Sequence, residues 1–165
     1  MKMVGQSGID TLSIEAVAAN AGLSKGGVFH HFPSKKNLLE EMFKECLAQF
    51  TKSFERERSA SHGISPAIAY LKATLADLET EAHRRTMLFL FQASTKEGYY
   101  RTYLDDWHKT HLQVDLTNEQ NVGPLLAVLV ADGLWNAGLY GFFEISEKQK
   151  KQIAHLVETL QQDQS

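Results

Sequence analysis

Three lysines and two histidines lie within residues 21–37, a stretch that contains neither Asp nor Glu. They are Lys25, Lys35, Lys36, His30 and His31. The whole chain of 165 residues, by contrast, has a formal net charge of -3. A local group of cationic side chains in an acidic chain is typical of a surface that contacts phosphate groups.

Two short helices are expected around this basic stretch. Ser13 is a good N-cap for the first helix, which ends at Gly22. Ser24 caps the second helix, which Pro33 ends. Two helices joined by so tight a turn are typical of a helix-turn-helix, in which the second helix lies in the major groove of DNA. A capped surface helix without a partner explains the same pattern equally well at this level.

The start of the second helix suits contact with a nucleic-acid backbone. Lys25 would face phosphate there, together with the free N–H groups and the positive dipole end of the helix. Gly26 and Gly27 follow, and glycine lets a backbone approach DNA closely at some cost in helix propensity. The pattern therefore predicts a surface that contacts the phosphates of DNA and lies close to a DNA groove.

A longer stretch resembles a known family. Residues 13–47, "SIEAVAANAGLSKGGVFHHFPSKKNLLEEMFKECL", closely resemble the DNA-binding region of the TetR/AcrR family of transcriptional regulators. The resemblance is carried by Gly22, Ser24, Lys25, Gly26, Phe29, His30, His31, Phe32, Ser34, Lys35 and Leu38. It implies a recognition helix from Lys25 to Phe32, with Phe32 and Leu38 in the core of the DNA-binding head.

The resemblance also implies which residues contact double-stranded DNA. Lys25 and Lys35 would hold the phosphate backbone, and Gly27, Val28 and His30 would lie nearest the base edges. The implied DNA-binding residues are Ser24, Lys25, Gly26, Gly27, Val28, Phe29, His30 and Lys35.

Three features depart from the family pattern. Phe29 stands where the family commonly has Tyr, whose hydroxyl contacts a phosphate, and Gly27 stands where Thr, Ser or Ala is frequent. The family also places a whole helix before Ile9, where only "MKMVGQSG" precedes in this sequence. These eight residues resemble the tail of that helix. We expect from this a loosely folded head that lacks most of its first helix and binds DNA weakly.

The chain as a whole is predicted to be all-α. Only three prolines occur, and stretches rich in Leu, Ala, Glu, Lys and Gln favour helices over strands. We expect a helix-turn-helix DNA-binding head at residues 1–47, then a helical ligand-binding and dimerisation bundle at residues 48–165. Later helices are expected to begin at Ser34, Pro66, Arg85, Gly98, Pro124 and Ser146.

The cellular compartment expected from the sequence is the cytoplasm. Cys46 is the only cysteine, so no internal disulfide can form, and the N-terminus has no apolar segment typical of a secretory signal. Residues 122–145 are as long and apolar as a bilayer span, but Asp132 and Asn136 lie in the middle. We therefore expect a helix buried in a bundle or a subunit interface rather than in a membrane.

This apolar helix and the last helix are expected to form a homodimer interface of four helices, as the family layout implies. Small residues at spacings of four would allow the helices to approach closely. The expected interface residues are Gly133, Ala137, Gly141, Ile153, Leu156, Val157 and Leu160.

Aromatic residues gather in the predicted bundle, and in most proteins such groups are plain core. The family resemblance implies a ligand pocket among them. The candidate ligand-binding residues are Phe89, Tyr103, Trp107, His111 and Trp135. His108 and His111, with Asp105 nearby, have a spacing that could bind a metal, but polar decoration of a pocket or surface is the preferred interpretation, so no metal or cofactor is expected.

The sequence thus predicts a homodimeric transcriptional regulator and no enzyme, since no phosphate-binding loop, nucleophile elbow or zinc-protease motif occurs. The resemblance implies a repressor that a small apolar or aromatic inducer releases from a palindromic DNA operator. The alternative is a dimeric small-molecule-binding protein with little DNA activity, because its head is incomplete.

Overall fold

The computed structural model describes residues 18–19, 22, 24–60, 63–77, 87–88, 98–142 and 144–162. Its helices are α2 (Lys25–His31), α3 (Lys35–Ala60), α4 (Pro66–Asp77), α6 (Tyr99–His111), α7 (Val122–Tyr140) and α8 (Glu147–Gln162). The residues so described contain no strand, which confirms the predicted all-α class. The remnant of a first helix before Ile9 lies outside these residues, as does most of the helix expected at residues 85–93.

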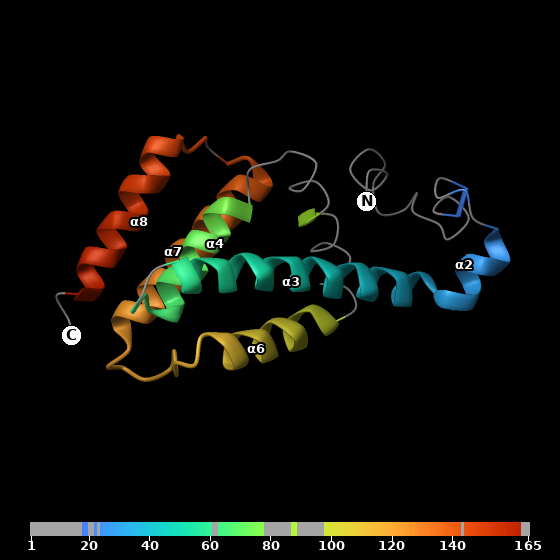
Figure 1. Ribbon diagram of the computed structural model, residues 1–165, viewed down its shortest axis with the longest axis horizontal. Helices are drawn as coiled ribbons and strands as arrows, with labels where there is room; N and C mark the ends of the chain where they lie inside the picture. Colours follow the sequence, from blue (N-terminus) through green and yellow to red (C-terminus); the bar gives the residue numbers. More distant parts are fainter. Residues whose placement is uncertain are drawn as a thin grey trace.

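The long helix α3 organises the molecule (Figure 1). It runs along the longest dimension, with α2 at one end and α4, α7 and α8 at the other, while α6 lies beside it. Its 26 residues span about 39 Å at about 1.5 Å per residue. The predicted domain boundary after residue 47 falls inside this helix.

Serine caps begin several helices, as the sequence predicts. The Ser24 hydroxyl accepts a hydrogen bond from the Gly27 amide at 3.1 Å. At α8, the Gln149 amide donates to the Ser146 hydroxyl at 3.2 Å, and the Ser146 amide donates to the Gln149 side chain at 2.9 Å. This reciprocal pair is a capping box, which satisfies amides that the first helical turn leaves open.

The helix expected from Pro124 begins two residues earlier, at Val122. Proline is tolerated in the first turn because its missing N–H has no partner to lose there. The sequence-based start at Pro124 is therefore corrected.

The bundle core forms where α4 packs between α3 and α7. Small side chains on α4 and α7 allow this close packing, because alanines keep the helix surfaces narrow. Ala69 and Ala73 of α4 and Ala127 and Ala131 of α7 are all fully buried. From α3, the ring of Phe54 fills the same core and has no exposed surface.

A second, smaller core joins α2 to the start of α3. Its buried members are Ala18, Val28 and Leu38, and Phe32 and Met42 pack against them. The resemblance-based placement of Phe32 and Leu38 in the head core agrees with this cluster. One continuous helix, α3, thus contributes side chains to both cores.

Among the described residues, α7 is long and apolar enough to cross a membrane by length and composition. It packs against α4 and α8, and the half-buried Asp132 at its centre accepts a hydrogen bond from the Tyr70 hydroxyl at 2.7 Å. These contacts identify α7 as a helix of the bundle.

Candidate DNA-binding and ligand-binding sites

The outer face of α2 presents polar and basic groups to solvent. Ser24, Lys25 and His30 are exposed, and the Phe29 ring is 39% exposed. The Lys25 ammonium lies 5.6 Å from the centre of the Phe29 ring. The first turns of α2 and α3 contain no acidic residue. This end of the molecule therefore offers an anion a positively charged face.

The two glycines of α2 have different local environments. A Cβ atom at Gly27 would lie 3.2 Å from the Ser24 hydroxyl oxygen, so a side chain there would crowd the cap. A Cβ atom at Gly26 would meet no atom within 4 Å in the described structure. The helix cap therefore explains a glycine at position 27, whereas no contact among the described residues of the head explains the glycine at position 26.

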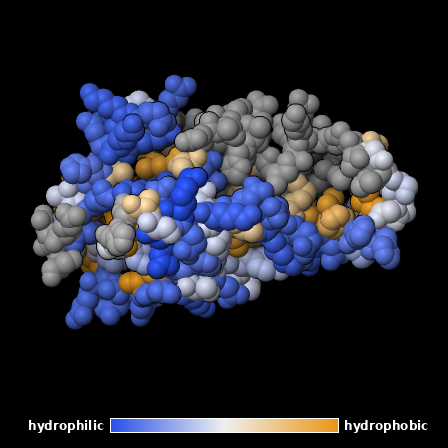
Figure 2. All heavy atoms as spheres, viewed as in Figure 1, coloured by the Kyte–Doolittle hydropathy of each residue, from blue (hydrophilic) through white to orange (hydrophobic). Residues whose placement is uncertain are grey.

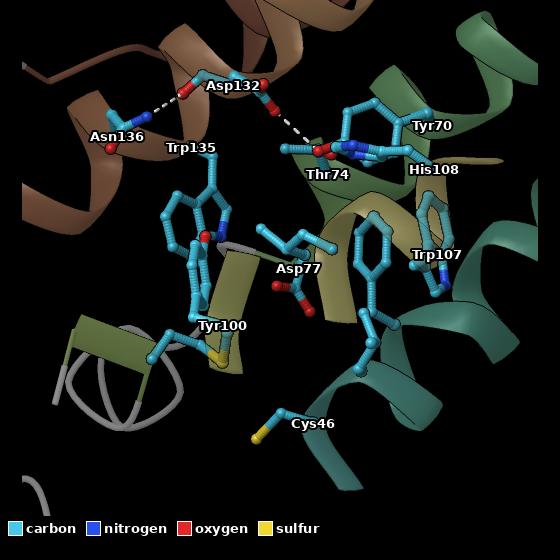
Figure 3. Close-up of a pocket in the computed structure, with 14 residues that line it drawn as sticks. Cys46, Tyr70, Thr74, Asp77, Tyr100, Trp107, His108, Asp132, Trp135 and Asn136 are labelled. Carbon is cyan, nitrogen blue, oxygen red and sulfur yellow. Dashed lines mark hydrogen bonds between the residues drawn. The ribbon is translucent and has the colours of Figure 1, made fainter. Parts of the chain in front are cut away.

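A cavity of about 160 Å³ lies in the bundle, between α3, α4, α6 and α7 (Figure 3). Its lining is largely aromatic, with a few polar groups. The lining residues are Cys46, Leu47, Phe50, Tyr70, Thr74, Asp77, Met87, Tyr100, Leu104, Trp107, His108, Asp132, Trp135 and Asn136. A cavity of this size is comparable to an engineered apolar cavity that binds benzene.

The polar groups of the cavity gather where α4 and α7 meet. Tyr70 donates its hydroxyl hydrogen to Asp132 Oδ1 at 2.7 Å, and Asn136 Nδ2 donates to the Asp132 carbonyl at 2.7 Å (Figure 3). Burial raises the pKa of Tyr70, and the Asp132 carboxylate adds to the rise. Burial also lowers the pKa of His108, although Asp132 opposes that shift, so His108 favours the neutral form.

Trp107 of α6 forms another part of the lining. Its indole N–H donates to the Thr51 hydroxyl at 2.8 Å, and this hydroxyl in turn donates to the Leu47 carbonyl at 2.7 Å. The His111 ring stacks on the indole, with centroids 4.5 Å apart and an angle of 12° between the planes. The indole is thus fixed from two sides.

Large apolar side chains are exposed on α7 and α8. Leu129 is 59% exposed and Leu156 is 60% exposed. The apolar face consists of Val122, Leu126, Leu129, Tyr140, Phe142, Leu156 and Leu160. Elsewhere, on the side of the molecule shown in Figure 2, hydrophilic residues cover most of the described surface. An exposed apolar face on two neighbouring helices is typical of a protein–protein interface.

Comparison of the sequence with models of known families identifies the family of this chain. Residues 1–42 match the model of bacterial regulatory proteins of the tetR family, and residues 65–162 match the model of the tetracyclin repressor-like C-terminal domain. The chain belongs to the TetR family. It is therefore a DNA-binding transcriptional regulator with a helix-turn-helix head and a helical C-terminal domain.

Curated relatives from two bacterial genera are similar over much of the chain. The HTH-type transcriptional regulator BetI of Pseudomonas paraeruginosa is 26% identical over 152 residues, which cover 84% of this chain and 76% of the relative. The HTH-type transcriptional repressor KstR2 of Mycolicibacterium smegmatis is 23% identical over 94 residues, covering 57% of this chain and 45% of the relative. These relatives are regulators and not enzymes. No solved structure matches at comparable significance.

In this TetR-family head, one residue expected near the base edges faces inward. Val28 is 3% exposed and packs against Ala18 and Leu38. Its side chain therefore points away from the exposed face of α2. Val28 and Phe32 are four residues apart and pack in the same cluster. Two apolar residues at this spacing indicate an inner face of a helix, so the sequence pattern could have predicted that Val28 is buried.

Some of the ligand-binding candidates line the cavity and others lie outside its lining. Trp107 and Trp135 line the cavity. Tyr103 is not among the lining residues, because its hydroxyl donates to Glu40 of α3. His111 lies against Trp107 and also outside the lining. Phe89 lies outside the described residues.

The two histidines of α6 face different neighbours. His108 packs against the Tyr70 ring and lines the cavity, whereas the Nδ1 atom of His111 lies 3.0 Å from the Trp107 carbonyl. Within the described part of the chain, no group of three or more His, Cys, Asp or Glu side chains could hold a metal.

The residues expected at a dimer interface differ in how exposed they are. Gly133, Leu156 and Leu160 are exposed, whereas Ala137 and Val157 are buried and Ile153 packs partly buried against the bundle core. Along an α-helix, side chains four residues apart point in directions that differ by about 40°. The direction therefore shifts from the exposed side of α7 at Gly133 to the buried side at Ala137.

Gly141 has a different role from the one expected. It ends α7 in a left-handed conformation with φ 65°, and its amide donates to the Ala137 carbonyl. Glycine is favoured there because a side chain would be strained at that φ. Gly141 is therefore a helix-terminating residue, and its small size does not by itself indicate helix approach.

Cys46 gives a direct test of burial at the cavity. Burial raises the pKa of its thiol to about 11, with the carboxylates of Asp77 and Glu45 adding to the rise. With that pKa, only about one thiol in a thousand is ionised at pH 8. The thiolate is the reactive form, so the folded chain should react slowly. We expect slow reaction with Ellman's reagent in the folded chain and rapid reaction in urea. Glutathione in the same buffers is the control, and rapid reaction of the folded chain would contradict this burial.

Proposed function

We propose that the chain is a homodimeric repressor that leaves a palindromic DNA operator when a small, largely apolar or aromatic ligand enters the cavity. One observation carries the proposal. Helix α3 lines the cavity through Cys46, Leu47 and Phe50, and the same helix holds Leu38 in the core of the DNA-binding head. A ligand that moves α3 therefore moves the surface that faces DNA.

The head would contact DNA through the exposed face of α2 and the start of α3. Lys25 and Lys35 supply charge for phosphates, and His30 is the exposed side chain suited to a base edge. Gly26 has no side chain and would let the backbone approach DNA closely, and a Cβ atom there would meet no described atom within 4 Å. The proposed contact residues are Ser24, Lys25, Gly26, Gly27, Phe29, His30 and Lys35.

Dimerisation would pair the apolar faces of α7 and α8 from two copies into a four-helix interface. Leu129 and Leu156 are the most exposed leucines of this face. Gly133 also lies on the exposed side, where a Cβ atom would meet nothing within 4 Å in the described structure. Two-fold pairing gives two recognition helices, as a palindromic operator requires.

The length of α3 explains how a bound ligand would release the DNA. A tilt of about 5° over about 39 Å displaces the far end of the helix by about 3 Å. The two recognition helices of a dimer must match half-sites one helical turn apart, so such a shift lowers DNA affinity. A ligand that binds the tilted form better shifts the population toward it. The cytoplasm is the compartment that suits this function.

A salt-dependent binding experiment tests the DNA surface. We expect the chain to select a palindromic duplex from the DNA immediately upstream of its own gene. Lys25→Ala and Lys35→Ala should each lower affinity about tenfold for all sequences and reduce the salt slope by about one, as lost phosphate contacts do. Fluorescence anisotropy across salt concentrations measures both quantities.

Lys148→Ala is the matched control, because Lys148 is exposed on α8 at the opposite end of the molecule. It should leave both quantities unchanged. If the unaltered chain binds no duplex from that region while it still binds small molecules, the repressor proposal fails. The alternative of a dimeric small-molecule-binding protein would then stand.

A further inference from the structure

The cavity holds buried polar atoms that a purely apolar ligand would leave without partners. Thr74 is only 2% exposed, and its hydroxyl oxygen has no hydrogen-bond partner in the described structure. The same is true of the Nε2 atom of His108. Both residues line the cavity, Thr74 from α4 and His108 from α6 (Figure 3). Buried polar groups without partners are costly, so their presence here points to a ligand that satisfies them.

A carboxylate lies in the same cavity. Asp132 accepts a hydrogen bond from the Tyr70 hydroxyl, but no ion pair joins it to a cationic side chain among the described residues. A carboxylate in an apolar surrounding is stabilised when a cation pairs with it. Asp132 is therefore suited to receive a positive charge from a ligand.

Aromatic rings line the same cavity. Phe50, Tyr70 and Trp107 lie in mutual contact, with ring centroids 5.3 to 5.7 Å apart. Trp135, three residues after Asp132 on α7, also lines the cavity. The faces of aromatic rings attract cations and also pack against an aromatic ligand ring. The lining thus combines aromatic rings with two carboxylates, those of Asp132 and Asp77.

We propose that the ligand is a protonated primary or secondary amine on a body of about one aromatic ring, with its ammonium group at Asp132 and with Thr74 and His108 as further acceptors. An ammonium group carries two or three N–H donors, which matches these acceptors. The inference rests on the proposed ligand-binding function of the cavity and names the class of ligand.

The state of His108 agrees with this role. Burial lowers its pKa, so the ring is neutral and can accept a hydrogen bond at Nε2 when its proton is on Nδ1. The Thr74 hydroxyl can accept in the same way. A cavity of about 160 Å³ has room for one ring and a short chain.

Three probes of nearly equal size test the class of ligand on the full chain. They are 2-phenylethylamine, which is a cation, 2-phenylethanol, which is neutral, and 3-phenylpropionate, which is an anion. Trp107 and Trp135 are the two tryptophans of the chain, and both line the cavity, so quenching of tryptophan fluorescence reports binding. We expect the amine to bind at least about tenfold more tightly than the alcohol, and the acid to bind most weakly.

Two variants locate the ammonium group. Asp132→Asn keeps an acceptor for Tyr70 and removes the charge, so affinity for the amine should fall about 10- to 100-fold while that for the alcohol changes less than about threefold. Thr74→Val should weaken the amine without lowering the melting temperature of the ligand-free chain, because the hydroxyl has no partner there. Asp106→Asn removes an exposed charge from α6 and should change neither affinity.

The outcomes separate this inference from the proposed function. Equal or tighter binding of the alcohol or acid, an unchanged amine affinity in Asp132→Asn, or no binding of any probe would overturn the amine site. Release of DNA by the neutral probe would then still support a ligand-controlled repressor. Asp132-dependent amine binding that leaves the DNA bound would establish the amine site and overturn the proposed coupling to DNA.

Discussion

Leu129→Glu is expected to convert the dimer into monomers and to weaken operator binding strongly. Leu129 is 59% exposed on the apolar face of α7, so a carboxylate there disturbs little within one chain. In a four-helix interface it would be buried without a cation, and two-fold symmetry adds a second carboxylate. We expect dimerisation to weaken about 100-fold or more, as at central interface positions.

Sedimentation at micromolar protein concentration measures the dimer, and fluorescence anisotropy measures operator affinity. Thr102→Glu is the matched control, because it adds the same charge at an exposed position of α6, outside the apolar face of α7 and α8. A Leu129→Glu chain that stays dimeric would show that this face is not the interface. A monomeric variant with undiminished operator affinity would contradict recognition by paired half-sites.

Phe54→Ala is expected to lower the free energy of unfolding by about 3–5 kcal/mol. The Phe54 ring has no exposed surface, and its centroid lies 5.2 Å from the Trp107 ring and 5.8 Å from the His111 ring. Removing the ring leaves a void among three helices that cannot collapse completely. A loss of this size is a large fraction of the stability of an ordinary domain.

Urea unfolding followed by tryptophan fluorescence measures this loss, at one fixed protein concentration because dimerisation contributes to stability. Phe29→Ala serves as the comparison, since Phe29 is partly exposed on α2, and its cost should stay below about 1 kcal/mol. Similar midpoints for the two variants would contradict the placement of Phe54 at the centre of the bundle.

Local chemistry alone indicated where most of the described helices begin. Ser24 and Ser146 mark helix starts because each hydroxyl satisfies an amide only three residues away. Along α3, buried Phe43, Cys46 and Phe54 recur at helical spacing and so reveal the face that packs inward. Such interactions lie within one or two turns, and a sequence pattern displays them directly.

The tertiary structure decided which groups meet across the bundle. Tyr70 and Asp132 are 62 residues apart in sequence, and Trp107 and Thr51 are 56 apart. Periodicity identifies the inner face of each helix but not the neighbour that covers it, which depends on helix crossing and axial shift. For this reason Thr74 was not foreseen as a cavity residue, although Asp132 in an apolar helix was already unusual in the sequence.

The same reason explains why some candidate residues lie away from the positions expected for them. Tyr103 lies on the same aromatic stripe as Trp107, yet its hydroxyl meets Glu40 of α3 instead of the cavity. Gly141 and Gly133 are both small, but only the backbone conformation shows that Gly141 ends a helix. Resemblance to known sequences indicated the family, whereas residue type and spacing indicated the helices and the basic face of α2. The packing of distant helices decided where the cavity lies and which side chains reach it, because those contacts depend on geometry that no single helix encodes.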